Sequence, residues 1–213
     1  ALVVDAIRGA DTIVCVNPRD VPEVRRARDA AAPVDVLAPF IDVAAFTGAL
    51  GAQHGHARDN RGVQLIAVAM MRDGAKLASY RALAAALAHA ADVRWSLRIV
   101  GDGPARRDVE RAFGPLGDRV SFVGEQPAPS IALMMRDSDL LVWPAIDEAI
   151  GLVFVEAQAC GVPVIGGDSP GVAAVIDAER TGVLVPPEDP LAFAAATAAS
   201  TTLIITGVMS TPV

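Results

Sequence analysis

The stretch DEAIGLVFVEAQACGVPVI, residues 147–165, decides the fold because a loop, a helix and a new strand follow one another within it. Glu148 and Gly151 lie in the loop, and a helical pattern begins near Leu152 and ends at a Cys-Gly pair. Glu156 lies inside this helix, eight residues after Glu148. At about 1.5 Å per residue, the two carboxylates are at most roughly 12 Å apart, which suits a nucleotide sugar better than one scissile bond. The same spacing also fits two unrelated charges beside a helix start.

The composition predicts a globular cytoplasmic protein that does not bind nucleic acid. With 213 residues and 53% hydrophobic composition, the chain can form one large domain, or one domain with a fragment of another. A net charge of −7 argues against a nucleic-acid partner, which clustered Lys and Arg would bind. The two cysteines are far apart and lack a CxxC spacing, so neither a disulfide framework nor a zinc site is expected. No run reaches the ~18 apolar residues of a membrane-spanning helix.

From residue 63 onward, short apolar runs alternate with segments of helical period. This pattern is typical of an α/β domain with a doubly wound parallel sheet, covered by helices on both faces. The expected strands are residues 64–69, 96–100, 120–123, 140–143, 163–165 and 183–185. The expected helices are residues 78–91, 105–113, 130–137, 152–160, 172–177 and 191–199. Such sheets bind ligands at the carboxyl ends of their strands, so the loops that follow the strands are the candidate site.

Two of these loops carry residue types that suit a phosphate or a nucleotide. MMRDGAKL at 70–77 contains Arg72 and Lys76, and Lys76 is the only lysine of the sequence. It fits a phosphate-binding turn or an ordinary charged turn, and the GxxxxGK[ST] motif is missing. GDGP at 101–104 provides Gly101 and Gly103, with Arg106 in place of a third glycine, so the dinucleotide fingerprint is incomplete. It predicts a tight turn whose backbone can approach a planar ligand.

Two other patterns resemble metal sites, and for both the sequence favours a structural explanation. Asp137-Ser138-Asp139 has the spacing of a divalent-cation motif, yet it precedes a strand, at the edge opposite the predicted ligand edge. We therefore expect it to cap structure rather than bind metal. His54 and His56 have no nearby cysteine or carboxylate cluster and are expected in a loop.

Residues 63–197 resemble the C-terminal, donor-binding domain of retaining GT-B glycosyltransferases of the family-4-like group. The resemblance is carried by VGDGP at 100–104, VSFVGE at 120–125, LLVWPAIDEAIGLVFVEAQACGVPVIGGDSPG at 140–171 and TGVLVPPEDP at 181–190. It implies that Glu148 contacts hydroxyls of the donor sugar and that Glu156 contacts the ribose of the nucleotide.

The resemblance also assigns the remaining donor contacts. The backbone of Ile150, Gly151, Leu152 and Val153 matches the segment that binds sugar and diphosphate, with the Gly101 and Gly103 turn beside it. Val123 and Gly124 match the loop that flanks the base.

The cations that face the diphosphate match the family in part. Lys76 matches the family's lysine, whereas the family's arginine aligns best with Met70, and Arg72 lies two residues later. The resemblance therefore makes Glu148, Lys76 and Arg72 the candidate catalytic residues.

The resemblance divides the chain into four segments. Residues 1–46 resemble the end of the N-terminal acceptor domain and the interdomain crossing, 47–62 form a linker, and 63–199 form the donor-binding domain. Residues 200–213 have no counterpart in the family, and the apolar residues 203–205 could form an aggregation-prone edge.

The expected function is binding of a UDP- or GDP-sugar for transfer of the sugar, with retention, to an acceptor hydroxyl. The nucleotide-diphosphate sugar would be the donor substrate, no cofactor is expected, and the transfer is expected to be independent of metal ions. The acceptor would be a glycan, a lipid or a small molecule bound by the full-length enzyme, whose missing domain leaves room for a peripheral membrane contact. The alternatives are a non-catalytic nucleotide-sugar-binding module and a GT-B-fold nucleotide-sugar epimerase. A phosphorylase is disfavoured because no pyridoxal-type lysine site is evident.

Overall fold

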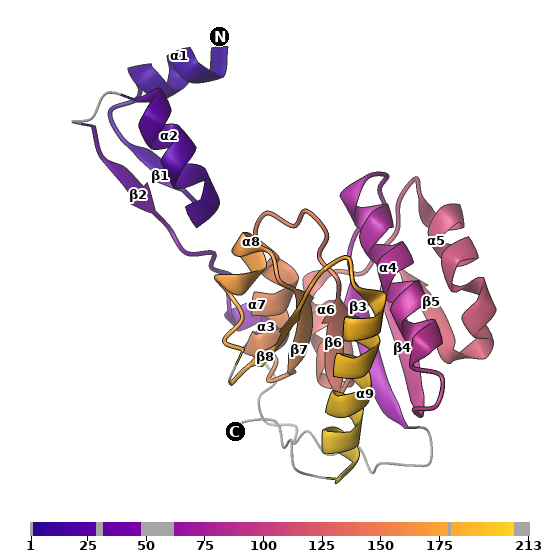
Figure 1. Ribbon diagram of the computed structural model, residues 1–213. Helices are drawn as coiled ribbons and strands as arrows, with labels where there is room; N and C mark the ends of the chain where they lie inside the picture. The colour runs from indigo at the N-terminus through magenta and orange to yellow at the C-terminus, as the bar shows by residue number, and fades with distance from the viewer. Residues whose placement is uncertain (1, 29–31, 48–61, 179, 207–213) are drawn as a thin grey trace.

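A small N-terminal part and a larger C-terminal domain make up the chain in the computed structural model, which describes residues 2–28, 32–47, 62–178 and 180–206 (Figure 1). The N-terminal part contains α1 (Leu2–Gly9), β1 (Ile13–Cys15), the 3-10 turn η1 (Pro18–Asp20), α2 (Val21–Ala27) and β2 (Val34–Val36). The short helix α3 (Ala44–Thr47) follows the crossing segment and packs against the larger domain.

The larger domain is built on a parallel sheet of six strands in the order β5-β4-β3-β6-β7-β8. The strands are β3 (Val63–Val68), β4 (Trp95–Val100), β5 (Val120–Gly124), β6 (Leu140–Trp143), β7 (Val164–Gly167) and β8 (Gly182–Val185). Each lies within two residues of its expected position, because buried parallel strands consist of uninterrupted apolar runs. The chain winds outward from β3 in one direction and from β6 in the other, so the switch point lies between these two strands.

Helices cover both faces of this sheet, which confirms the predicted doubly wound architecture. The helices are α4 (Ala75–His89), α5 (Arg106–Phe113), α6 (Ala128–Arg136), α7 (Leu152–Ala159), α8 (Pro170–Ala173) and α9 (Pro190–Thr206), with the turn η2 (Gly114–Arg119) before β5. Helices α4, α5 and α9 pack together in one layer, and α3, α6 and α7 pack together in the other (Figure 1).

The end of α9 differs from the sequence expectation. Residues 203–205, expected as a potential edge, lie in α9, which continues past residue 199 to Thr206. The reason is packing at helical spacing, since Phe193, Thr197 and Ile204 are all buried although the segment is rich in β-branched residues. The last residues of the expected tail, 207–213, lie outside the described residues, as do most of the expected linker, 48–61, and both of its histidines.

The N-terminal part is a two-stranded parallel sheet with two helices. Ile13 pairs with Val34 to set the register of β1 and β2, and the guanidinium of Arg28 donates to the carbonyls of Ala10 and Asp11. Val14 and Val36 are 53% and 51% exposed, so this sheet leaves apolar side chains uncovered by the described residues.

No helix in the described ranges is both long enough and apolar enough to cross a bilayer.

Candidate functional site

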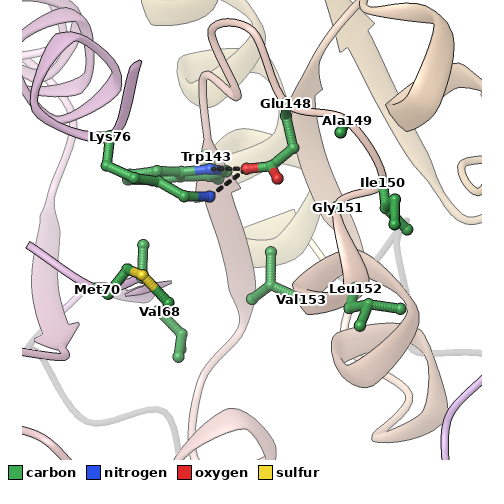
Figure 2. Close-up of a pocket in the computed structure, with 11 residues that line it drawn as sticks. Val68, Met70, Lys76, Trp143, Glu148, Ala149, Ile150, Gly151, Leu152 and Val153 are labelled. Carbon is green, nitrogen blue, oxygen red and sulfur yellow. Dashed lines mark hydrogen bonds and ion pairs between the residues drawn. The ribbon is translucent and has the colours of Figure 1, made fainter. Parts of the chain in front are cut away.

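A pocket of about 290 Å³ lies at the carboxyl ends of β3 and β6, the two strands at the switch point of the sheet (Figure 2). It is lined by Val68, Ala69, Met70, Lys76, Trp143, Glu148, Ala149, Ile150, Gly151, Leu152 and Val153. The structure thus brings Lys76, Glu148 and residues 150–153 together, as the sequence predicted for the loops that follow strands.

An ion pair between Lys76 and Glu148 crosses the pocket. Lys76 comes from the first turn of α4, and its Nζ donates to Oε2 of Glu148 from the loop after β6. The two side chains retain 26% and 17% of their exposure, so both remain within reach of a ligand. The Lys76 Nζ also lies 5.7 Å from the centre of the Trp143 ring, and the indole N–H lies 3.5 Å from Glu148 Oε2 (Figure 2). The buried indole of Trp143 therefore contacts both charged groups, the ammonium through its ring and the carboxylate through its N–H.

The loop that carries Glu148 has a strained backbone. Ala145 and Asp147 have φ values of +56° and +50°, a region that costs a residue with a side chain about 1 kcal/mol or more. Two contacts from other elements hold this loop. The Oγ of buried Ser79 on α4 accepts a hydrogen bond from the Ile146 N–H at 2.9 Å, and the Oγ of Ser169 donates to the Glu148 carbonyl at 3.4 Å.

The N-terminus of α7 opens directly beside the ion pair. Gly151 has left-handed backbone angles, φ +71° and ψ +46°, and turns the chain into the helix. A Cβ on Gly151 would lie 2.7 Å from the Phe154 ring, so both conformation and space require glycine. Within the described part of the chain, the N–H groups of residues 150–153 have no intramolecular acceptor. Free N–H groups at the positive end of a helix dipole are a suitable site for phosphate.

Neither Met70 nor Arg72 brings a second positive charge to the pocket wall. Met70 is 49% exposed on the wall of the pocket, at the position where the family resemblance places an arginine. Arg72 is exposed and is not among the residues that line the pocket. The pocket wall therefore carries one lysine and one glutamate, whose formal charges cancel.

Glu156 does not line this pocket. It is half-buried on α7, and burial raises the pKa of its carboxyl above the ordinary value of 4.5. The carboxyl is close enough to Cys160 that its charge adds to burial in raising the pKa of that thiol. The two glutamates of residues 147–165 thus occupy different environments, one beside a lysine in a pocket and the other partly desolvated on a helix.

The glycines at the ends of β4 and β5 lie close to the loop that follows β3. A Cβ on Gly101 would lie 2.0 Å from the Ala69 carbonyl oxygen, and one on Gly103 would lie 2.3 Å from the Met71 carbonyl oxygen. The N–H of Gly101 donates to the carbonyl of Gly124 at 2.8 Å, next to Val123 on β5. These glycines allow the loops after β3, β4 and β5 to pack closely, although none of them lines the pocket.

The Asp137-Ser138-Asp139 triplet has the structural role that the sequence predicted. It precedes β6, at the edge of the sheet opposite the pocket. The Asp139 carboxylate accepts a hydrogen bond from the Gln64 N–H at 2.8 Å, and the Asp139 N–H donates to the Gln64 carbonyl. The Ser138 hydroxyl donates to the carbonyl of Met134. The triplet therefore ties the start of β6 to the start of β3.

Contacts from distant segments support the site, and sequence reasoning missed them. Ser79, Ser169 and Asn17 each hold one peptide group of the Glu148 loop. Ser79 and Asn17 lie far from that loop in the sequence, and each is an ordinary polar residue in its own local pattern. No local signal could have found them.

A parallel sheet of this order, with a pocket at its switch point and free helix N–H groups in it, defines a Rossmann-like ligand-binding domain. Residues 63–201 match the family model described as "Glycosyl transferases group 1". This match covers more than half of the chain, so the chain belongs to the group 1 glycosyltransferase family.

Individual relatives agree with this assignment. D-inositol 3-phosphate glycosyltransferase of Salinispora tropica is 36% identical over 105 residues, 45% of this chain and 22% of the relative. Alpha-D-kanosaminyltransferase of Streptomyces kanamyceticus is 37% identical over 91 residues, 42% of this chain and 24% of the relative. The crystal structure of Anabaena HepE in complex with UDP-glucose matches with a TM-score of 0.75 at 20% identity, over 97% of this chain and 58% of that chain. This chain therefore spans only part of the relatives it matches, and the structural match shows the GT-B-type fold alone.

Proposed function

We propose that this chain binds a nucleotide-diphosphate sugar as the donor part of a retaining glycosyltransferase. The observation that supports this most directly is the pocket at the switch point, where Lys76, Glu148 and the N-terminus of α7 meet. A lysine and free helix N–H groups suit a diphosphate, and a carboxylate beside them suits the hydroxyls of a sugar.

The diphosphate lies between Lys76 and the N–H groups of residues 150–153 in this proposal. Binding requires Lys76 to shift from Glu148 towards phosphate, which releases the Glu148 carboxylate to accept hydrogen bonds from the sugar. The 26% exposure of Lys76 leaves its ammonium accessible for this exchange. Arg72 is exposed in the loop between β3 and α4, so it contributes to the electrostatic potential around the site rather than to the pocket wall.

The base and ribose extend from the diphosphate towards Glu156 and the wall formed by Gly101, Gly103, Val123 and Gly124. A half-buried carboxylate that binds two ribose hydroxyls regains hydrogen bonds that partial burial has removed. The glycines at the ends of β4 and β5 have no side chain, so backbone atoms of these turns can approach a planar base.

In the complete enzyme, the sugar leaves the diphosphate and joins an acceptor hydroxyl with retention of the anomeric configuration. Lys76 and the helix N–H groups stabilise the negative charge that develops on the leaving diphosphate. Glu148 orients the sugar rather than attacking it. The uncovered apolar side chains of β1 and β2 support the assignment of residues 1–46 to an acceptor domain, which would bind the glycan, lipid or small-molecule acceptor.

A thermal-shift panel followed by calorimetry tests the donor proposal. UDP, GDP and their glucose and mannose conjugates are added separately, because the names of the two relatives described above specify no nucleotide. A ligand that binds only the native state raises the melting temperature, by an amount that grows with concentration. If none of these ligands raises it at millimolar concentration, the donor proposal is wrong.

A non-catalytic nucleotide-sugar-binding module is the second candidate function. Such a module would bind the donor through the same pocket residues without transferring the sugar. An assay for sugar release from UDP- and GDP-sugars separates the two. Binding without release supports a module that needs a further domain for catalysis, and turnover by this chain alone would refute that requirement.

A further inference from the structure

A residue of the N-terminal part reaches the loop of the candidate site. Asn17 follows β1 and caps the turn η1, where its Oδ1 accepts a hydrogen bond from the Arg19 N–H at 2.9 Å. Its Nδ2 donates to the carbonyl of Ala149 at 3.0 Å, across 132 positions of the sequence. Asn17 is only 5% exposed, so its amide is confined between the two parts of the molecule.

The Ala149 carbonyl is enclosed from a second side by α8. A Cβ on Gly171 would lie 1.9 Å from the Ala149 oxygen, so the carbonyl occupies space that any other residue at 171 would fill. The turn η1 itself packs against α8. The preceding carbonyl, that of Glu148, is held by Ser169 at the start of the same helix. Two consecutive peptide groups of the loop are therefore held by two elements that contact each other.

The orientation of this carbonyl fixes the next N–H group. In a trans peptide unit the C=O and the following N–H point in opposite directions within one plane. When the Ala149 oxygen faces Asn17 and Gly171, the Ile150 N–H is turned to the opposite side, away from them. Ile150 lines the pocket, and its N–H is one of those without an acceptor in the described part of the chain.

We propose that Asn17 is a positioning residue for the donor pocket, by which the N-terminal part fixes the Glu148–Gly151 loop and its free N–H groups. This inference rests on the proposed function of the pocket. It makes donor affinity depend on the N-terminal part, although that part contributes no side chain to the pocket wall.

The amide of Asn17 does more than cap the turn η1. Ser, Asp and Asn cap a helical turn about equally well, because each provides an oxygen that accepts from the backbone. Only Asn among them also has an N–H₂ group, and this group makes the bond to Ala149. The variants Asn17→Ser and Asn17→Asp therefore keep a capping oxygen and remove the amide N–H₂ that reaches Ala149, whereas Asn17→Ala removes both.

The test measures binding of UDP-glucose and GDP-mannose, with UDP and GDP, by calorimetry for the wild type and the three variants. Each of the three variants should bind the preferred nucleotide sugar about three- to tenfold more weakly, with Asn17→Asp the weakest because its carboxylate faces a carbonyl. If Asn17→Ser and Asn17→Asp bind like the wild type and only Asn17→Ala is impaired, the residue is a cap and the inference is wrong.

Hydrogen exchange provides a readout that does not depend on ligand. Amides of residues 145–154 should exchange faster in Asn17→Ser than in the wild type, while those of β3 in the sheet core stay unchanged. Equal exchange at 145–154 would overturn the inference, even if the wild type binds nucleotide sugars. If the wild type binds none of the four ligands but the loop exchanges faster in the variant, the proposed function of the pocket fails while the structural coupling stands.

Discussion

The two ends of the stretch from Glu148 to Glu156 are stabilised in different ways. At the loop end, Glu148 pairs with Lys76, and the backbone around it adopts strained angles that contacts from α4, α8 and η1 maintain. At the helix end, Glu156 lies on a regular turn of α7, and burial raises the pKa of its carboxyl.

This difference shows how one short segment places two carboxylates in different environments. The loop end depends on partners that lie far away in the sequence, among them the Lys76 ammonium. The helix end depends on the hydrogen bonds of α7 and on burial. The donor proposal assigns the sugar to the first and the ribose to the second.

Replacing Lys76 should have the largest effect, because it removes the cation of the loop end and leaves Glu148 unpaired. We expect Lys76→Ala to weaken binding of a nucleoside diphosphate about 100-fold, or ~2.7 kcal/mol, as calorimetry would measure. Arg81→Ala is the matched control, since Arg81 is exposed on the same helix and carries the same charge. Unchanged binding in Lys76→Ala would remove this residue from the phosphate site.

Replacing Gly151 should destabilise the junction between the loop that carries Glu148 and helix α7. In Gly151→Ala, the side chain must adopt a left-handed conformation and displace the Phe154 ring, so we expect the free energy of unfolding to fall by about 2 kcal/mol. Urea denaturation measures this change. Gly114→Ala is the control, because Gly114 has helical angles and open space around it, and it should be neutral or slightly stabilising. Equal stability of the two variants would contradict the strained junction.

Glutamine in place of each glutamate should separate the sugar contact from the ribose contact. Glu148→Gln should weaken binding of the nucleotide sugar about tenfold, ~1.4 kcal/mol, while leaving binding of the free nucleoside diphosphate unchanged or stronger, because Lys76 is released. Glu156→Gln should weaken both ligands to the same extent, because both contain the ribose. Calorimetry with UDP and UDP-glucose, or the GDP pair, measures the ratios. Identical ratios for the two variants would refute the division of roles.

The smallest expected effect is on stability and its dependence on pH. Burial raises the pKa of Glu156 in the folded state, so the folded chain binds more protons than the unfolded chain above pH 4.5. The free energy of unfolding therefore falls as pH rises through this window, and Glu156→Gln should be the more stable protein at neutral pH. We expect a melting temperature higher by about 2 °C at pH 7, and no difference below pH 4.5. A variant that is less stable than the wild type at pH 7 would show that the carboxylate has a favourable partner.

Much of the fold was predictable because its signals are local. The six strands of the large sheet are short apolar runs, and glycine or proline stands at or next to the start of most helices between them, so the strands and helices of residues 63–199 were found within a few residues. Residues 200–206 were not, because a β-branched, uncharged segment has no local preference for helix and forms one only when its inward face packs on the domain.

The candidate site was predictable in part. Lys76, Glu148 and residues 150–153 follow parallel strands or begin helices, and that position alone brought them to one edge of the sheet. The exposed Met70 on the pocket wall, the placement of Arg72 outside it and the burial of Glu156 depend on how loops pack, which no spacing rule describes.

The sequence by itself determined the parallel α/β domain, the edge of the sheet where a ligand would bind, and some of the residues at that edge, among them Lys76 and Glu148. Only the tertiary structure decided that Lys76 pairs with Glu148, and that Ser79, Ser169 and Asn17 hold the loop between them. The physical reason is that periodicity and capping are set by neighbours within a few residues. A contact across 132 positions exists only once both segments have packed on a common core.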